Sequence, residues 1–212
     1  MLSIGKLGSG QETYYLEKVA EGAEDYYSGE GEAEGQWIGS AAAEFALDAK
    51  VEPQQLVDIL TGRNPVTGEP LGLKSAPGRE PVPGFDLTFS APKSVSLTWA
   101  LGGPPVGGQV MAAHQAAVGA ALGYMERHAC WARRGKGGAT FVPGAGFLAA
   151  AYVHRSSRAG DPQLHTHVLV DTPEDTDVFY VLTRRPLRQE YVVSEHYFYQ
   201  VCTDGTIKWR SR

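Results

Sequence analysis

A β-hairpin that carries three histidines is predicted by the stretch Phe147-Leu-Ala-Ala-Ala-Tyr-Val-His154-Arg-Ser-Ser-Arg-Ala-Gly-Asp-Pro-Gln-Leu-His165-Thr-His167-Val-Leu-Val170. Residues 147–155 and 164–170 have the apolar, β-branched composition of strands. The polar segment between them contains Gly160 and Pro162, which favour a turn. We therefore expect two antiparallel strands joined by a short loop.

The three histidines of this hairpin are expected to share one face. His165 and His167 are two residues apart, which puts both imidazoles on the same side of a strand, and His154 lies roughly 5 Å across if the register is direct. Three imidazoles suit a divalent metal ion and leave a position open for substrate. We predict such an ion as cofactor, with Mg, Mn and Zn not distinguished. The alternative is an ordinary His-Thr-His pair on an exposed strand with His154 unrelated, and the third histidine favours the metal site.

Composition places the chain among globular proteins with one substantial core. It has 212 residues, of which 42% are hydrophobic, and two cysteines, too few for a disulfide framework. No apolar run approaches the roughly 20 residues of a membrane-spanning helix, and the first residues lack the apolar region of a signal peptide. We expect a cytoplasmic protein without a membrane segment.

Charge is distributed unevenly along the chain. Residues 1–60 carry 12 acidic and 3 basic side chains, a net charge of −9, whereas residues 61–212 carry 16 basic and 12 acidic ones, a net charge of +4. Several basic residues lie near the histidine hairpin in sequence: Arg127, Arg133, Arg134, Lys136, Arg155 and Arg158. A basic surface around a metal suits a phosphodiester substrate, although a solvated charged face explains the same pattern equally well.

The remaining pattern predicts an α+β fold, with a central antiparallel β-sheet, the histidine strands in its middle and flanking helices on one side. Residues 85–90 alternate as a half-buried strand whose polar face carries Asp86. Ser90 can cap a helix that begins near Pro92, and Lys93 in its first turn could help to dock a phosphate. Further helices are expected over 11–27, 40–61 and 109–132, with His114 and His128 on the surface of the last, and an extended connection over 61–83.

Several of these motifs together resemble the relaxase domain of the TrwC/TraI-type (MobF) conjugative relaxases. The similar motifs are Met1-Leu-Ser-Ile, the pairs Tyr14-Tyr15 and Tyr26-Tyr27, Asp86-Leu-Thr-Phe-Ser-Ala-Pro-Lys-Ser-Val-Ser96 and Ser157-Arg-Ala-Gly-Asp-Pro-Gln-Leu-His-Thr-His167. That family belongs to the HUH endonucleases. The resemblance implies a metal-dependent enzyme of plasmid conjugation that nicks one DNA strand at an origin of transfer and stays joined to its 5′ end through a phosphotyrosine.

The resemblance also implies roles for individual residues and partners. Tyr14 would be the first nucleophile and Tyr26 the second, with Tyr15 and Tyr27 supporting them, and Asp86 would orient a metal histidine. The basic residues Lys93, Arg155 and Arg158 are candidates for phosphate contacts. The implied partners are single-stranded DNA at an origin of transfer and other proteins of the relaxosome.

The sequence departs from the family pattern after Val170. The family runs from the histidine strand into a short polar turn and a tryptophan-bearing strand, and here only Asp204-Gly-Thr-Ile-Lys-Trp209 resembles that turn. We therefore divide the chain into a relaxase-like core, 1–170, and a divergent segment, 171–212, that is a truncation, an insertion or a frame-disrupted remnant. Two alternatives stay open: an inactive remnant that at most binds single-stranded DNA, and a three-histidine metallohydrolase that uses metal-bound water.

Overall fold

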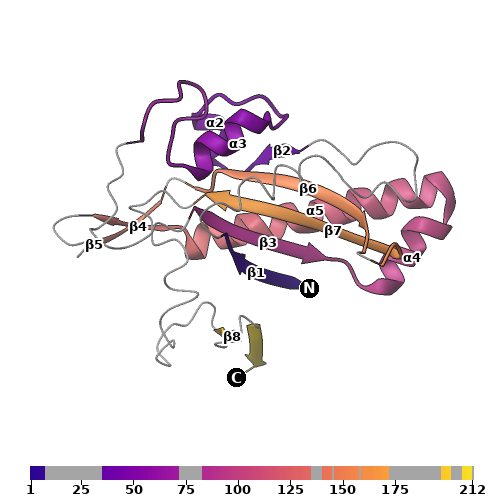
Figure 1. The fold of residues 1–212 in the computed structure, drawn as a ribbon. Helices are drawn as coiled ribbons and strands as arrows, with labels where there is room; N and C mark the ends of the chain where they lie inside the picture. Colours follow the sequence, from indigo (N-terminus) through magenta and orange to yellow (C-terminus); the bar gives the residue numbers. More distant parts are fainter. Residues whose placement is uncertain are drawn as a thin grey trace.

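The protein is built around one five-stranded antiparallel sheet, seen in the computed structural model of Figure 1. The structure describes residues 1–7, 35–71, 83–134, 140–144, 146–157, 159–171, 197–201 and 207–211. The strand order is β1-β3-β7-β6-β2. These strands are β1 (Leu2–Lys6), β2 (Gln36–Ile38), β3 (Gly84–Ser90), β6 (Ala149–Ser156) and β7 (Pro162–Asp171). The α+β class and the central position of the histidine strand β7 are as the sequence predicted.

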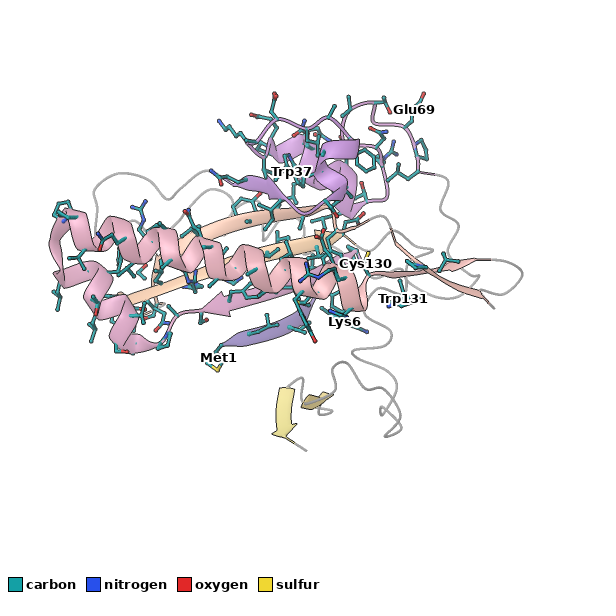
Figure 2. All side chains as sticks on the ribbon, turned by 180° about the vertical axis from the view of Figure 1, so that it is seen from behind. Met1, Lys6, Trp37, Glu69, Cys130 and Trp131 are labelled. Carbon is teal, nitrogen blue, oxygen red and sulfur yellow. The ribbon has the colours of Figure 1, made fainter. Side chains whose placement is uncertain are left out.

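One face of the sheet packs against the long helix α5 (Gly103–Ala129), which Figure 2 shows lying across the strands. Its buried residues Val118, Leu122 and Met125 contact buried side chains of β3 and β7 in one apolar cluster. The shorter helix α4 (Lys93–Leu101) connects β3 to α5. This layer explains why the odd-numbered residues Phe85, Leu87 and Phe89 of β3 are apolar.

The opposite face is covered over part of its length by a small helical lobe, which lies beside β2 in Figure 1. The lobe comprises α2 (Ala41–Glu44) and α3 (Pro53–Leu60). Leu56 and Ile59 of α3 pack in a second apolar cluster with Trp37 and Leu169 of the sheet. In Figure 2 Trp37 lies beneath the lobe, where its indole N–H donates to Gln55 Oε1 at 3.2 Å. The sequence predicted helices on one side of the sheet only, and this was wrong.

The carboxylate of Glu126 ties this lobe to helix α5. Its Oε1 atom accepts the backbone N–H of Ser40 at 2.7 Å, the Ser40 hydroxyl at 2.9 Å and the Phe147 N–H at 2.9 Å. Gly39 and Gly146, with φ of 92° and 136°, flank these donors in conformations that only glycine adopts readily. A Cβ at Gly146 would collide with the Ser40 side chain. One carboxylate therefore joins three segments that are distant in sequence.

Several element boundaries differ from those predicted. Helix α5 begins at Gly103 rather than 109, because prolines are tolerated in the first helical turn. Ser90 does not cap α4, whose N-cap is Pro92 without a side-chain hydrogen bond. The short strands β1 and β2 at the sheet edges were not predicted. Two further antiparallel pairs are β4 (Trp131–Arg134) with β5 (Thr140–Pro143) and β8 (Tyr197–Val201) with β9 (Ile207–Ser211). Within the described ranges, no helix is long and apolar enough to cross a membrane.

Replacing Leu87 by alanine should destabilise the fold strongly. Leu87 is fully buried on β3 between the sheet and α5, and removing a buried leucine side chain costs about 2 to 5 kcal/mol of unfolding free energy. The measurement is the urea midpoint followed by circular dichroism. Val66→Ala is the control, because Val66 is 61% exposed and its loss should change stability little. Equal effects of the two substitutions would contradict this assignment of the core.

Candidate metal centre

The two strands β6 and β7 bring the three histidines together in the predicted register. His154 is paired directly with His165, and His167 is paired with Tyr152. The centroids of the imidazole rings are 5.2 Å apart for His154 and His165, 5.1 Å for His154 and His167, and 5.2 Å for His165 and His167. The histidines thus form a nearly equilateral triangle on one face of the sheet.

This triangle has the size expected of three ligands to one ion. A metal–nitrogen distance of about 2.1 Å puts a ring centroid about 3.2 Å from the metal, and two such rings at a tetrahedral angle are about 5.2 Å apart. Among the described residues, no group of three or more His, Cys, Asp or Glu side chains is arranged so that it could hold a metal ion as it stands, and the assignment rests on the separations of the rings.

Hydrogen bonds place the ring proton on Nδ1 in two of these imidazoles. The Nδ1 atom of His167 lies 2.8 and 3.0 Å from the two carboxylate oxygens of Asp86, which accept hydrogen bonds from its N–H group. The Nδ1 atom of His165 lies 2.8 Å from the backbone carbonyl of Gln163 and donates to it. Each contact fixes the tautomer in which Nε2 carries the lone pair, which is the usual arrangement of ligating histidines.

Asp86 lies where its predicted role requires it. It is on β3, on the strand next to His167, and only 8% of it is exposed. Thr88, to which the sequence analysis gave no role, is paired with His167, and its hydroxyl lies 3.3 Å from both Asp86 Oδ1 and His167 Nδ1. The alternation of β3 could have indicated this threonine, because it shares the polar face with Asp86.

Helix α4 holds the turn of the histidine hairpin. The ammonium group of Lys93 forms an ion pair with the carboxylate of Asp161 and donates to the Pro162 carbonyl at 2.8 Å. The buried hydroxyl of Ser96 accepts the N–H of Leu164 at 3.0 Å. A phosphate would have to compete with Asp161 for Lys93, and the phosphate contact predicted for this lysine stays a prediction.

Tyr152 lies beside the histidine cluster and packs in the apolar cluster of the helical lobe. It lies on β6, two residues before His154, and is only 3% exposed. Burial raises the pKa of the Tyr152 phenol far above its ordinary value. Because the Tyr152 side chain is buried in the apolar cluster beneath the lobe, we assign it a role in packing.

The other predicted site residues are placed less completely. Arg158 and the four tyrosines of the predicted site lie outside the described residues. These tyrosines are Tyr14, Tyr15, Tyr26 and Tyr27. Arg155 follows His154 in β6 and is partly buried. The structure therefore brings together the metal-ligand candidates and Asp86, while the roles of the tyrosines and arginines stay predictions.

Comparison with known proteins places this geometry in context. The family model described as TrwC relaxase matches residues 8–201, which is past the boundary at 170 to which the resemblance was expected to extend. The multifunctional conjugation protein TraI of Escherichia coli is 34% identical over 168 residues, and TraI of Escherichia coli strain K12 is 33% identical over 172 residues. These alignments cover 79% and 80% of this chain but only 9% of each relative.

Solved structures of the conjugative relaxase TrwC have the same fold. A metal-bound complex of TrwC with oriT DNA superimposes with a TM-score of 0.67 at 27% identity, and a copper-bound complex with a TM-score of 0.66 at 28% identity. Each match covers 100% of this chain and 61% of the solved chain. The chain is thus shorter than the solved TrwC chains.

Replacing any one of the three histidines by alanine should lower the metal content. Each ring supplies one corner of the triangle, and two remaining imidazoles hold a divalent ion more weakly. Metal is measured by mass spectrometry after loading with Mn²⁺ or Zn²⁺ and dialysis. His128→Ala, on the exposed part of α5, is the control. Unchanged stoichiometry in all three single variants would contradict the site.

Asp86→Asn should weaken metal affinity while the protein stays folded. The amide keeps the shape of the side chain but no longer offers two anionic acceptors to His167 Nδ1, and loss of such a contact typically costs 10- to 100-fold in affinity. Isothermal titration calorimetry checks this, with Asp48→Asn in the exposed part of the lobe as control. An affinity equal to that of the unmutated protein would show that Asp86 has no part in holding the ligand.

Proposed function

The chain belongs to the TrwC relaxase family, and from this premise we propose that it is a metal-dependent DNA relaxase of plasmid conjugation. In this proposal it nicks one strand at an origin of transfer and forms a 5′-phosphotyrosine. The triangle of His154, His165 and His167, with Asp86 behind one ring, is the observation that carries the proposal. It provides the ligands that a phosphoryl-transfer metal needs.

The chemistry of these ligands fits a phosphodiester substrate. A bound divalent ion would neutralise charge on the non-bridging oxygens of a phosphate. The chain's own contribution is to present three neutral imidazoles on one partly exposed face, with Asp86 fixing the ring of His167. Because the opposite face of the sheet is buried under α5, the substrate would approach from the histidine side.

The length of the tyrosine-bearing segment is compatible with attack from that side. Residues 8–34 stand in the sequence between Leu7, whose N–H donates to the Gly84 carbonyl at 3.0 Å, and Gly35, where a Cβ would collide with the ring of Tyr152. Tyr14 is seven residues after Leu7, so it can be up to about 25 Å away along an extended chain. Gly35 adjoins Tyr152, which is paired with His167, so this end of the segment lies near the cluster; Leu7 lies beside Gly84, which is paired with Asp171 at the other end of β7.

The proposed step is a transesterification in which no bond energy is lost to water. The Tyr14 oxygen forms a bond to phosphorus as the bond to the 3′ oxygen breaks. The phenol gives up its proton and the departing 3′ oxygen gains one, so the products are a 5′-phosphotyrosine and a free 3′ hydroxyl. The ordinary phenol pKa of about 10 means that the nucleophile must be activated in the site. Tyr26 would serve a second transfer, with Tyr15 and Tyr27 in support.

The proposed partner is single-stranded DNA at an origin of transfer. The solved TrwC structures that this chain resembles hold oriT DNA, and the basic excess of residues 61–212 favours a polyanion. Other relaxosome proteins are possible further partners. Conjugative DNA processing of this kind takes place in the cytoplasm, which is the proposed location.

Tyr14→Phe tests the nucleophile. The substitution removes only a hydroxyl, so metal and DNA binding should persist while the covalent protein–DNA adduct falls at least 100-fold, since positioning of the nucleophile contributes much of the rate. Adducts are detected by denaturing electrophoresis after incubation with divalent metal and a panel of single-stranded origin oligonucleotides. Tyr152→Phe is the matched control and should form adduct normally, because that phenol is buried.

Other outcomes of the same experiment discriminate among the alternatives. Tyr26→Phe should spare the first cleavage and impair strand transfer to a second oligonucleotide. If Tyr14→Phe forms the adduct and Tyr15→Phe or Tyr26→Phe does not, the nucleophile is the other tyrosine, and the phosphotyrosine mechanism still holds. Cleavage without adduct in every tyrosine variant would establish the hydrolase, and neither cleavage nor adduct in the unmutated chain would establish the inactive remnant.

A further inference from the structure

Helix α5 presents a histidine, His114, to the sheet in line with its apolar stripe. The stripe consists of positions separated by three or four residues, which share one face of a helix: His114, Val118, Leu122, Met125 and Ala129. The last four are buried against the sheet. His114 therefore occupies a position at which the same helix otherwise carries a buried apolar side chain; it is partly exposed, as the sequence-based assignment to the helix surface implies, but its ring also contacts the sheet.

The contact of His114 is with the residue that separates two of the clustered histidines. Thr166 lies between His165 and His167 on β7, and the alternation of the strand turns it toward α5. Only 3% of Thr166 is exposed, and its hydroxyl lies 2.9 Å from His114 Nε2. A buried hydroxyl requires such a partner, because the site offers it little water.

The neutral form of the His114 ring is suited to a hydrogen bond with the Thr166 hydroxyl. Burial, and to a smaller extent the positive charge of the chain's amino terminus, lowers the pKa of His114. A neutral imidazole either donates to the threonine oxygen or accepts its proton, and a hydroxyl can take the complementary role in both cases. The contact is consequently satisfied in either tautomer.

This side-chain contact meets β7 at Thr166, which the ladders to β3 and β6 hold through the backbone and which the other side-chain contacts of the strand do not touch. Helix α4 holds the beginning of the strand through Ser96 and Leu164, and Asp86 holds the ring of His167 on the opposite face. The bond from His114 to Thr166 attaches the backbone between the two ligand candidates to the helix layer behind it. Metal affinity depends on ligand placement within about 0.5 Å, so a shift at this point would be felt by both rings.

We propose that His114 is a positioning residue for the histidine cluster, acting through Thr166 to fix β7 between His165 and His167. The inference rests on the proposed metal site and deepens it. It assigns to the helix layer a part in setting the ligand geometry, in addition to its part in the core. His114 itself lies on the far side of the sheet and touches neither metal nor DNA in this proposal.

The test compares His114→Ala and Thr166→Val with His128→Ala, using Co²⁺ as the probe. Thr166→Val keeps the volume and the β-branched shape and removes only the hydroxyl, so it stays informative if His114→Ala folds poorly. We expect each of the first two to weaken Co²⁺ affinity roughly 10-fold and to change its visible d–d absorption, with no additional loss in the double variant. Thr166→Ser should restore binding, and His128→Ala should leave it unchanged.

A second readout separates this inference from the proposed function. In metal-free protein, the NMR signals of the His165 and His167 rings should shift in His114→Ala and Thr166→Val and stay in place in His128→Ala. Unchanged ring signals together with unchanged Co²⁺ absorption in folded variants would overturn the inference. Failure of the unmutated protein to bind Co²⁺ would contradict the metal centre instead, and the ring signals would still decide whether His114 positions β7.

Discussion

Pairing of β7 on both edges is the constraint on which the rest of the structure depends. Strand β6 on one side supplies His154, and β3 on the other side supplies Asp86. Because side chains alternate, a shift of one residue in either ladder would turn a required group toward α5. The apolar residues Leu164, Val168 and Val170 of β7 are buried against the helix layer, so the hydrophobic core fixes the register that the polar face uses.

The two long sequence motifs, residues 86–96 and 157–167, contact each other in the structure. Within 86–96, Asp86 holds the ring of His167, Lys93 pairs with Asp161, and Ser96 holds the backbone of Leu164. A single strand-to-helix segment thus contacts the strand, the turn and one ligand candidate of the histidine hairpin. Asp86, Lys93 and Ser96 are not metal-ligand candidates themselves, but their contacts with the hairpin give a structural reason for the two motifs to occur together.

The strands at the centre of the sheet could be predicted from local sequence patterns. The orientation of His114 and the position of the helical lobe could not, because they depend on contacts between distant residues. Alternation and a turn signal identified the hairpin, its register and the polar face of β3. The alanines at 113 and 117 fit either side of α5, so they concealed that His114 faces inward. The helical lobe on the second face depends on the distant contacts of Glu126, which no local pattern reveals. The tyrosine-bearing segment and Arg158 lie outside the described residues, and their roles stay predictions.

The different chain separations within the cluster have a consequence for the order of folding. The three imidazoles belong to one hairpin, whose short loop costs little entropy to close, whereas Asp86 is 81 residues from His167. Local hairpins form quickly and distant strands pair slowly. An ion that meets the unfolded full-length chain would therefore find the three imidazoles of the hairpin before β3 pairs with β7 and brings Asp86 to His167, and it would favour the hairpin as a nucleus onto which β3 subsequently docks.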